Sequence, residues 1–123
     1  MNHLAHFALA GPETGLLVGG FLGDYIKGRL ENRFSPDIER GIRLHRAIDR
    51  YTDSHLVVKH SYTRLDPRFR RYAGIITDIA YDHLLAQDWH QYYKEPLESY
   101  SASTLAKLLA HKDMLPIAAR QDA

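Results

Sequence analysis

The sequence contains no cysteine, and this absence removes several kinds of chemistry at once. Disulfide bridges, thiolate metal sites and cysteine nucleophiles are all excluded. Any metal ion that the chain binds must therefore be held by oxygen and imidazole ligands. The lack of disulfide-forming residues also fits a reducing compartment, and we expect a cytoplasmic protein.

Long apolar runs and strand patterns are missing as well. No apolar run approaches the roughly 18 residues that a membrane span needs, and the first 15 residues have no basic segment before their apolar stretch. No segment alternates apolar and polar residues between turn signals, and no internal repeat occurs. We therefore expect an all-α fold and no membrane partner.

The length and composition indicate one folded domain. With 123 residues the chain has room for a single modest hydrophobic core. Its content of 45% hydrophobic and 25% charged residues is typical of globular proteins and unlike that of disordered chains. We treat residues 1–123 as one domain.

The first helical pattern, from Leu16 to Ile26, is interrupted by three glycines. Glycine costs up to about 1 kcal/mol per helix position relative to alanine. Gly19, Gly20 and Gly23 therefore indicate either close backbone packing or a local bend.

Two further helices have clear start signals. Ser35 and Pro36 suit the N-cap and first position of a helix that continues to about Thr52. A second start at residues 66–67 leads into a long periodic stretch that reaches Trp89. This long stretch is the strongest candidate for the core of the fold.

The last part of the chain predicts a break and a short helix. Residues 94–96 interrupt the helical pattern with a proline. From Ser103 to His111 the sequence is amphipathic, with three leucines, Leu105, Leu108 and Leu109, on one side.

Acidic residues and histidines recur at helical spacing on two of the predicted helices. His45, Asp49 and Asp53 are four residues apart and share one face, and Asp78 and Asp82 repeat this spacing. Such a mixed oxygen and imidazole set suits Mn²⁺ or Mg²⁺, which would polarise a phosphoryl oxygen and activate an attacking water. The candidate ligands are Asp24, His45, Asp49, Asp53, Asp78, Asp82 and His83.

A structural interpretation of the same residues remains open. A buried carboxylate needs a cation, and an arginine such as Arg43, Arg46 or Arg50 could supply it through a salt bridge between helices. His6 is either a further metal ligand or an ordinary core histidine, and its apolar surroundings favour the core. The other histidines, including His3, have no acidic face near them and are interpreted as surface or capping residues.

Positive charge is concentrated in the middle of the chain. Twelve of the 16 lysines and arginines lie between Lys27 and Arg71, against six acids, which gives this window a charge of +6 in a protein of net charge +1. The window favours an acidic partner or substrate, or is simply a solvated helix surface. No phosphate loop or nucleic-acid motif accompanies it, and we expect no nucleic-acid partner.

Four stretches, taken in order, resemble the acyl-carrier-protein phosphodiesterases, also called acyl-carrier-protein hydrolases, a bacterial family distantly similar to the HD-domain phosphohydrolases. The stretches are MNHLAHFALA, GGFLGDYIKG, PDIERGIRLHRAIDRYTD and ITDIAYDHLLAQDW. They fall within residues 1–93 and leave 94–123 as a poorly matched tail. The resemblance implies an HD-domain-like helical bundle that is shortened at its C-terminus.

The same resemblance implies an activity and a set of site residues. The activity is metal-dependent hydrolysis, with Mn²⁺ or Mg²⁺, of the phosphodiester that joins 4′-phosphopantetheine to a serine of holo acyl carrier protein. The implied catalytic residues are Asp24, His45, Asp49 and Asp78, and the implied metal ligands are these four with Asp82 and His83. His6 is included in the metal set as the further candidate named above.

The implied partner, acyl carrier protein, is acidic and would be attracted by the +6 window. Guanidinium and ammonium groups there would bind the substrate, and the candidates are Lys27, Arg43, Arg46 and Arg50. A missing helical layer would expose apolar surface through which copies of the chain could form a homo-oligomer. Two rivals stay open, namely a phosphohydrolase of nucleotides or other small phosphodiesters, and a non-catalytic helical binding module.

Overall fold

The computed structural model describes residues 1–115, which contain helices and no β-strand. The all-α prediction is confirmed. No helix in this range is both long and apolar enough to cross a lipid bilayer. The helices are α1 (His3–Ala10), α2 (Thr14–Leu22), α3 (Pro36–Ser54), α4 (Leu56–Thr63), α5 (Ala73–Gln87), α6 (Trp89–Tyr92) and α7 (Leu97–Ala110), with the 3₁₀ helices η1 (Pro67–Tyr72) and η2 (Lys112–Met114).

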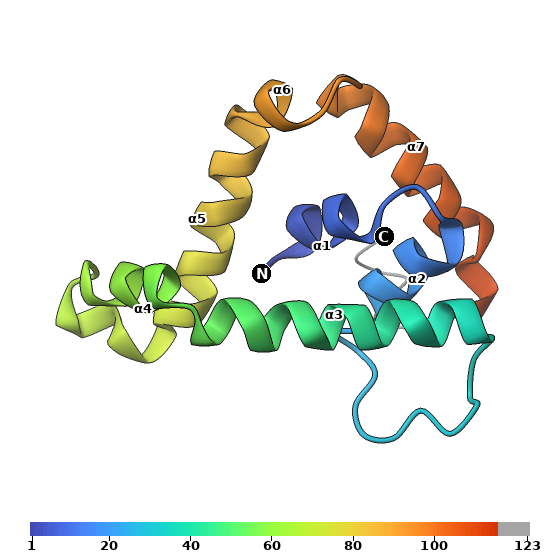
Figure 1. The fold of residues 1–123 in the computed structure, drawn as a ribbon, viewed down its shortest axis with the longest axis horizontal. Helices are drawn as coiled ribbons and strands as arrows, with labels where there is room; N and C mark the ends of the chain where they lie inside the picture. The colour runs from blue at the N-terminus through green and yellow to red at the C-terminus, as the bar shows by residue number, and fades with distance from the viewer. Residues whose placement is uncertain (116–123) are drawn as a thin grey trace.

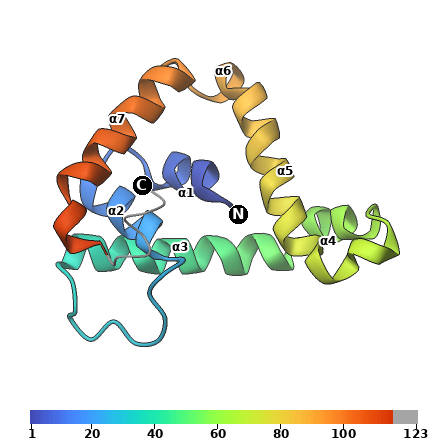
Figure 2. The ribbon, with the colours of Figure 1, turned by 180° about the vertical axis from the view of Figure 1, so that it is seen from behind.

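Three helices form a triangular frame around α1 and α2 (Figure 1). Helix α3 makes one side, and α5 and α7 rise from its two ends toward α6 at the opposite corner, as the reverse view also shows (Figure 2). Inside the frame α2 packs along α3, while α1 contacts α2, α3 and α5. The N-terminal helix therefore lies where side chains from three other helices can meet it.

Glycines allow α2 and α3 to cross at close range. A Cβ atom on Gly19 would collide with the carbonyl oxygen of Ile38, and one on Gly41 would lie 2.8 Å from the Gly19 Cα atom. A Cβ on Gly23 would overlap the ring of His45. Gly19 and Gly23 thus serve close packing, which was one of the two interpretations of the glycine-rich stretch.

Replacing Gly19 with alanine is expected to destabilise the fold by about 3 kcal/mol or more, because the added methyl group meets rigid backbone. Gly74→Ala is the matched control, since a Cβ at Gly74 meets nothing within 4 Å. We expect the control to change the free energy of unfolding by less than about 1 kcal/mol. Urea denaturation of both variants measures the difference, and equal losses would contradict a tight crossing.

Two predicted helix starts and one predicted break are found in the structure. Ser35 is the N-cap of α3 and Pro36 its first residue. The Asp66 side chain accepts a hydrogen bond of 2.9 Å from the Arg68 amide, but the helix that it begins is η1, and α5 follows only after it. Residues 94–96 separate α6 from α7. Local sequence signals thus located these boundaries, whereas α7 begins at Leu97, six residues before the predicted Ser103.

The core lies between α2, α3 and the end of α7, and the prediction that the long helix supplies it is wrong. In α5 only Ala73 and Thr77 are buried, whereas Ile75 and Ile79 are 63% and 56% exposed. Helix α5 makes its main contacts with α1, α4 and η1, which leave Ile75 and Ile79 uncovered. The core cluster consists of Val18, Phe21, Leu22, Ile26, Leu30, Ile38, Ile42, Leu108 and Leu115.

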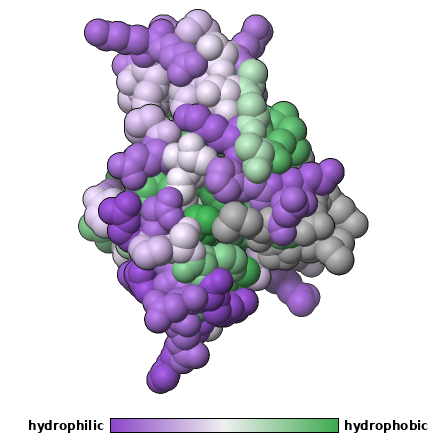
Figure 3. All heavy atoms as spheres, turned by 90° about the vertical axis from the view of Figure 1, so that its right-hand side faces the viewer, coloured by the Kyte–Doolittle hydropathy of each residue, from purple (hydrophilic) through white to green (hydrophobic). Residues whose placement is uncertain are grey.

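Helix α7 is also only partly covered. Of its three predicted apolar residues, Leu108 is buried, while Leu105 and Leu109 are exposed. Figure 3 shows the side of the molecule that carries α7, where apolar atoms are visible between hydrophilic side chains. Exposed apolar surface of this kind fits association between copies of the chain, which stays a prediction.

Candidate metal centre

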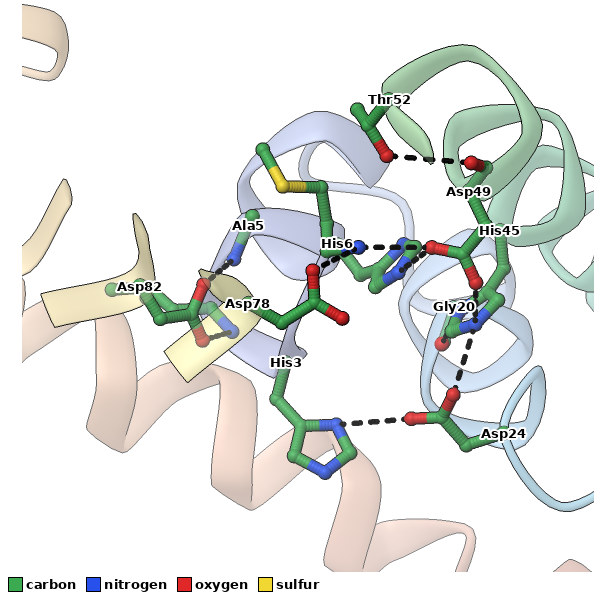
Figure 4. Close-up of polar contacts among 12 residues, drawn as sticks. His3, Ala5, His6, Gly20, Asp24, His45, Asp49, Thr52, Asp78 and Asp82 are labelled. Atoms are coloured by element: carbon green, nitrogen blue, oxygen red, sulfur yellow. Dashed lines mark hydrogen bonds and ion pairs between the residues drawn. The ribbon is translucent and has the colours of Figure 1, made fainter. Parts of the chain in front are cut away.

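Four polar side chains from different parts of the chain meet where α1, α2 and α3 come together (Figure 4). His6 comes from α1, Asp24 follows the end of α2, and His45 and Asp49 come from α3. The absence of a side chain at Gly23 makes room for the His45 ring. Both imidazoles are buried and both carboxylates are partly exposed. We call these four residues the central cluster.

The two imidazole rings of the central cluster lie face to face, with centroids 3.6 Å apart and planes within 10° of parallel. The Nε2 atom of His6 lies 3.0 Å from Oδ1 of Asp49. The Nε2 atom of His45 lies 3.2 Å from Oδ1 of Asp24 and 3.2 Å from Oδ2 of Asp49. Ligand atoms of His6, His45 and Asp49 fall within 4.8 Å of one another, which is close enough for one metal ion to bind all three.

A backbone hydrogen bond sets the orientation of His45. Its Nδ1 lies 2.7 Å from the carbonyl oxygen of Gly20, so the Nδ1–H group donates to that oxygen. Consequently Nε2 is the nitrogen that faces the carboxylates, and in the neutral ring it carries a lone pair. Metal-binding histidines are commonly oriented by such a bond at the other ring nitrogen.

The two carboxylates of the central cluster favour the protonated, positively charged form of His45. Burial alone would lower its pKa, but hydrogen bonds with Asp24 and Asp49 outweigh this and raise the pKa to about 9. The hydrogen bond with His45 in turn lowers the pKa of Asp24. Burial opposes ionisation of Asp49, yet its pKa is also lowered, because both imidazoles and the α-amino group of Met1 hydrogen-bond to it. A divalent ion would have to displace the His45 proton.

The donor set of the cluster fits a divalent metal ion. The converging ligand atoms belong to His6, His45 and Asp49, and Asp24 places a second carboxylate beside His45, so that two carboxylates would balance a charge of +2. Two imidazoles suit Mn²⁺ better than Mg²⁺, which prefers oxygen ligands. Arginine salt bridges, the alternative interpretation, do not involve Asp24 or Asp49 within residues 1–115, where their ion pairs are with histidines and the α-amino group. The described residues therefore contain a His/Asp group able to bind a metal.

Asp78 approaches the central cluster through an intermediate cation. Its Oδ1 lies 3.3 Å from the α-amino nitrogen of Met1, which lies 3.1 Å from Oδ1 of Asp49. Burial raises the pKa of Asp78, and the neighbouring ammonium only partly opposes this. Asp78 therefore lies at the border of the central cluster. Its carboxyl group is easier to protonate than those of Asp24 and Asp49.

The other two predicted residues of α5 lie outside the cluster. Asp82 accepts hydrogen bonds of 2.9 and 3.0 Å from the backbone amides of Leu4 and Ala5, and so caps the start of α1. His83 is exposed to solvent. Asp82 thus contributes to the site indirectly, because it fixes the start of α1, the helix that carries His6.

Sequence reasoning missed His3, whose interpretation as a residue without acidic neighbours is wrong. Its Nδ1 lies 3.9 Å from Oδ2 of Asp24, and its ring packs against Phe7 and Phe21. The available signal was its spacing of three from His6, which places both histidines on one side of a helix.

A pocket of about 320 Å³ opens beside the cluster and carries most of the predicted basic residues. Within it the Arg46 guanidinium also donates to the carbonyl oxygen of Ile26 at 3.2 Å. Arg43 does not line this pocket and instead pairs with Glu39 at 3.4 Å. The polar pocket, as we call it, is lined by Asp24, Lys27, His45, Arg46, Asp49 and Arg50, together with Gly23, Ile26 and Gly28.

Comparison with known proteins identifies relatives along nearly the whole chain. A family model described as acyl carrier protein phosphodiesterase matches residues 1–122, a longer range than the motifs seen within residues 1–93. The chain is 37% identical over 91 residues to the acyl carrier protein phosphodiesterase of Yersinia pestis, covering 74% of the chain and 47% of the relative. It is 32% identical over 117 residues to that of Yersinia enterocolitica, covering 94% and 61%.

A third relative, from Pectobacterium atrosepticum, is 37% identical over 101 residues, covering 81% of the chain and 52% of the relative. The chain therefore spans about half to three fifths of the length of these relatives. No solved structure matches it. Because the family model covers residues 1–122, the chain belongs to the acyl carrier protein phosphodiesterase family.

Proposed function

We propose that this chain hydrolyses the phosphodiester bond between 4′-phosphopantetheine and the serine of holo acyl carrier protein, with Mn²⁺ or Mg²⁺ as cofactor. The observation that carries the proposal is the central cluster of two imidazoles and two carboxylates beside a basic pocket. The names of the relatives supply the substrate. Since those relatives are longer, their activity and partner are proposed for this chain rather than assigned to it.

Each part of the site has a proposed role. His6, Asp24, His45 and Asp49 would hold the ion, which when bound would polarise a phosphoryl oxygen and lower the pKa of an attacking water. The polar pocket would neutralise and orient the phosphate through its lysine and arginines. Asp78, with its raised pKa, is the carboxyl that we propose for proton transfer.

The proposed partner and location follow from the same reaction. Acyl carrier protein is acidic, and the +6 window includes the basic residues of the polar pocket, so opposite charges would steer the encounter. An enzyme acting on this carrier would work in the cytoplasm, which is the location we propose.

The direct test is to incubate the chain with holo acyl carrier protein and Mn²⁺ and to weigh the carrier by mass spectrometry. We expect the carrier to lose the mass of its prosthetic group, and EDTA to prevent this loss. An intact carrier after incubation with folded, metal-loaded protein would contradict the proposal. Faster turnover of bis-p-nitrophenyl phosphate would favour a general phosphohydrolase, and the absence of a Mn²⁺-induced thermal shift would favour a binding module.

Replacing Arg50 with alanine is expected to lower kcat/KM for the holo carrier by about 10- to 100-fold, because a charge-assisted hydrogen bond to phosphate is worth roughly 1.5 to 3 kcal/mol. Arg40→Ala is the matched control. Arg40 lies on the same helix, does not line the polar pocket and pairs with Glu13. Initial rates measured by mass spectrometry compare the two variants. A similar loss in both would indicate a general effect of surface charge.

A further inference from the structure

A second pocket, of about 260 Å³, lies between α1, α2 and α7 and shares no lining residue with the polar pocket. Its size is near the lower end of small-molecule sites, roughly 300 to 1,000 Å³. Phe21 and Leu108 belong to the hydrophobic core. The part of the pocket wall that they form is therefore held in place by core packing. We call it the apolar pocket, and its main lining residues are His3, Phe7, Phe21, Tyr100, Leu105 and Leu108.

The apolar pocket adjoins the central cluster through His3. One side of the His3 ring meets Phe21, with ring centroids 5.5 Å apart. The Nδ1 atom of the same ring lies 3.9 Å from Oδ2 of Asp24. If the phosphate of a ligand bound at the central cluster, the atoms attached to that phosphate would lie next to the apolar pocket.

We infer that the apolar pocket receives the pantetheine arm of the substrate, an inference that rests on the proposed function. After a methylene next to the phosphate, the arm has a carbon bearing two methyl groups, and it continues through a hydroxyl-bearing carbon and two amides. Its methyl groups suit an apolar wall such as Phe7 and Phe21. The serine side of the phosphodiester, by contrast, belongs to the acidic carrier and would face the basic window.

The amides of the arm match a second feature of the apolar pocket. The Tyr100 hydroxyl is buried, and no hydrogen-bond partner is found for it among residues 1–115. Burial raises the pKa of this hydroxyl, and the nearby Thr104 side chain only partly opposes the rise. An unpaired buried hydroxyl is costly, and a hydrocarbon ligand would leave it unpaired. The oxygen itself is closed off from solvent, so the Tyr100 side chain would have to turn toward the pocket before an amide carbonyl could pair with it. With that turn of Tyr100, the lining would favour an amide-bearing chain over a simple lipid tail.

The test compares the binding of 4′-phosphopantetheine with that of inorganic phosphate to the Mn²⁺-loaded protein, by titration calorimetry. We expect phosphopantetheine to bind about tenfold more tightly or better, because only it can fill the apolar pocket. Leu105→Trp should remove this advantage by occupying the pocket. Leu109→Trp is the control, since Leu109 lies one turn further along α7, is 47% exposed against 42% for Leu105, and does not line the pocket.

Equal binding of the two ligands to the unmodified protein would overturn the inference, as would equal effects of the two tryptophan variants. If circular dichroism shows that Leu105→Trp is unfolded, Ser101→Phe replaces it, because Ser101 is an exposed lining residue. A change of oligomeric state caused by Leu105→Trp alone would assign the pocket to an interface and also overturn it.

The two proposals fail in different ways. Selective, Leu105-sensitive binding of phosphopantetheine without cleavage of the holo carrier would support the pocket and contradict the proposed activity. Cleavage of the carrier without selective binding would support the activity and contradict the pocket.

Discussion

Replacing Asp49 with asparagine is expected to abolish most Mn²⁺ binding and, with it, hydrolysis of the holo carrier. Asp49 is the central member of the cluster, because its carboxylate meets both imidazoles and the α-amino group. Asparagine keeps the shape but removes the charge and one acceptor oxygen. We expect affinity for Mn²⁺, measured by titration calorimetry, to fall by about 100-fold or more, since even outer-shell substitutions cost 10- to 100-fold.

Asp53→Asn is the matched control for this experiment. Asp53 is one turn further along the same face of α3, is exposed and does not belong to the central cluster. It should keep Mn²⁺ affinity within about twofold. Retention of metal by a folded Asp49→Asn variant would show that the ion binds elsewhere.

The stabilisation by metal is expected to grow steeply as the pH rises from about 6.5 to 9. In the metal-free protein the pKa of His45 is about 9, above its ordinary value of 6.5, so the imidazolium stabilises the fold. This contribution, of roughly 3 kcal/mol, is fully present below pH 6.5 and is lost as the pH rises through about 9. Metal binding requires the neutral ring, so protons compete with the ion throughout this window.

Thermal melts in EDTA and in Mn²⁺, recorded at several values between about pH 6 and pH 8.5, measure this competition. We expect the Tm without metal to fall with increasing pH and the difference between the two conditions to widen. The control is His45→Gln, which removes the titrating ring and should flatten both trends. A metal-induced shift in Tm that is independent of pH would show that His45 does not bind the ion.

Local signals in the sequence predicted the parts of the fold that local chemistry determines. The N-cap serine and following proline located the start of α3, and the dense glycines indicated the close approach of α2 and α3. Helical spacing likewise placed His45 and Asp49 on one face. Asp24 lies on a different segment and meets them because α2 and α3 cross, so helical spacing could not predict this contact.

Tertiary arrangement decided the features that the sequence could not predict. Periodicity identifies an apolar helix face but does not tell whether another layer covers it, and Ile75 and Ile79 of α5 are uncovered. Asp78 and Asp82 lie one turn apart on the same helix and have similar neighbours in the sequence. Asp78 nevertheless borders the central cluster, whereas Asp82 caps α1. Asp78 and Asp82 differ because of where the start of α1 packs against α5. The position of one helix relative to another cannot be predicted from a local sequence pattern.

The parallel stacking of His6 on His45 should give the central cluster a distinctive NMR signal. With ring centroids 3.6 Å apart, each imidazole lies in the shielding region of the other's ring current. The carbon-bound protons of both rings should therefore resonate upfield of those of exposed histidines in a ¹H NMR spectrum. Loading with diamagnetic Mg²⁺ would move these signals, so occupancy of the centre could be followed without any substrate.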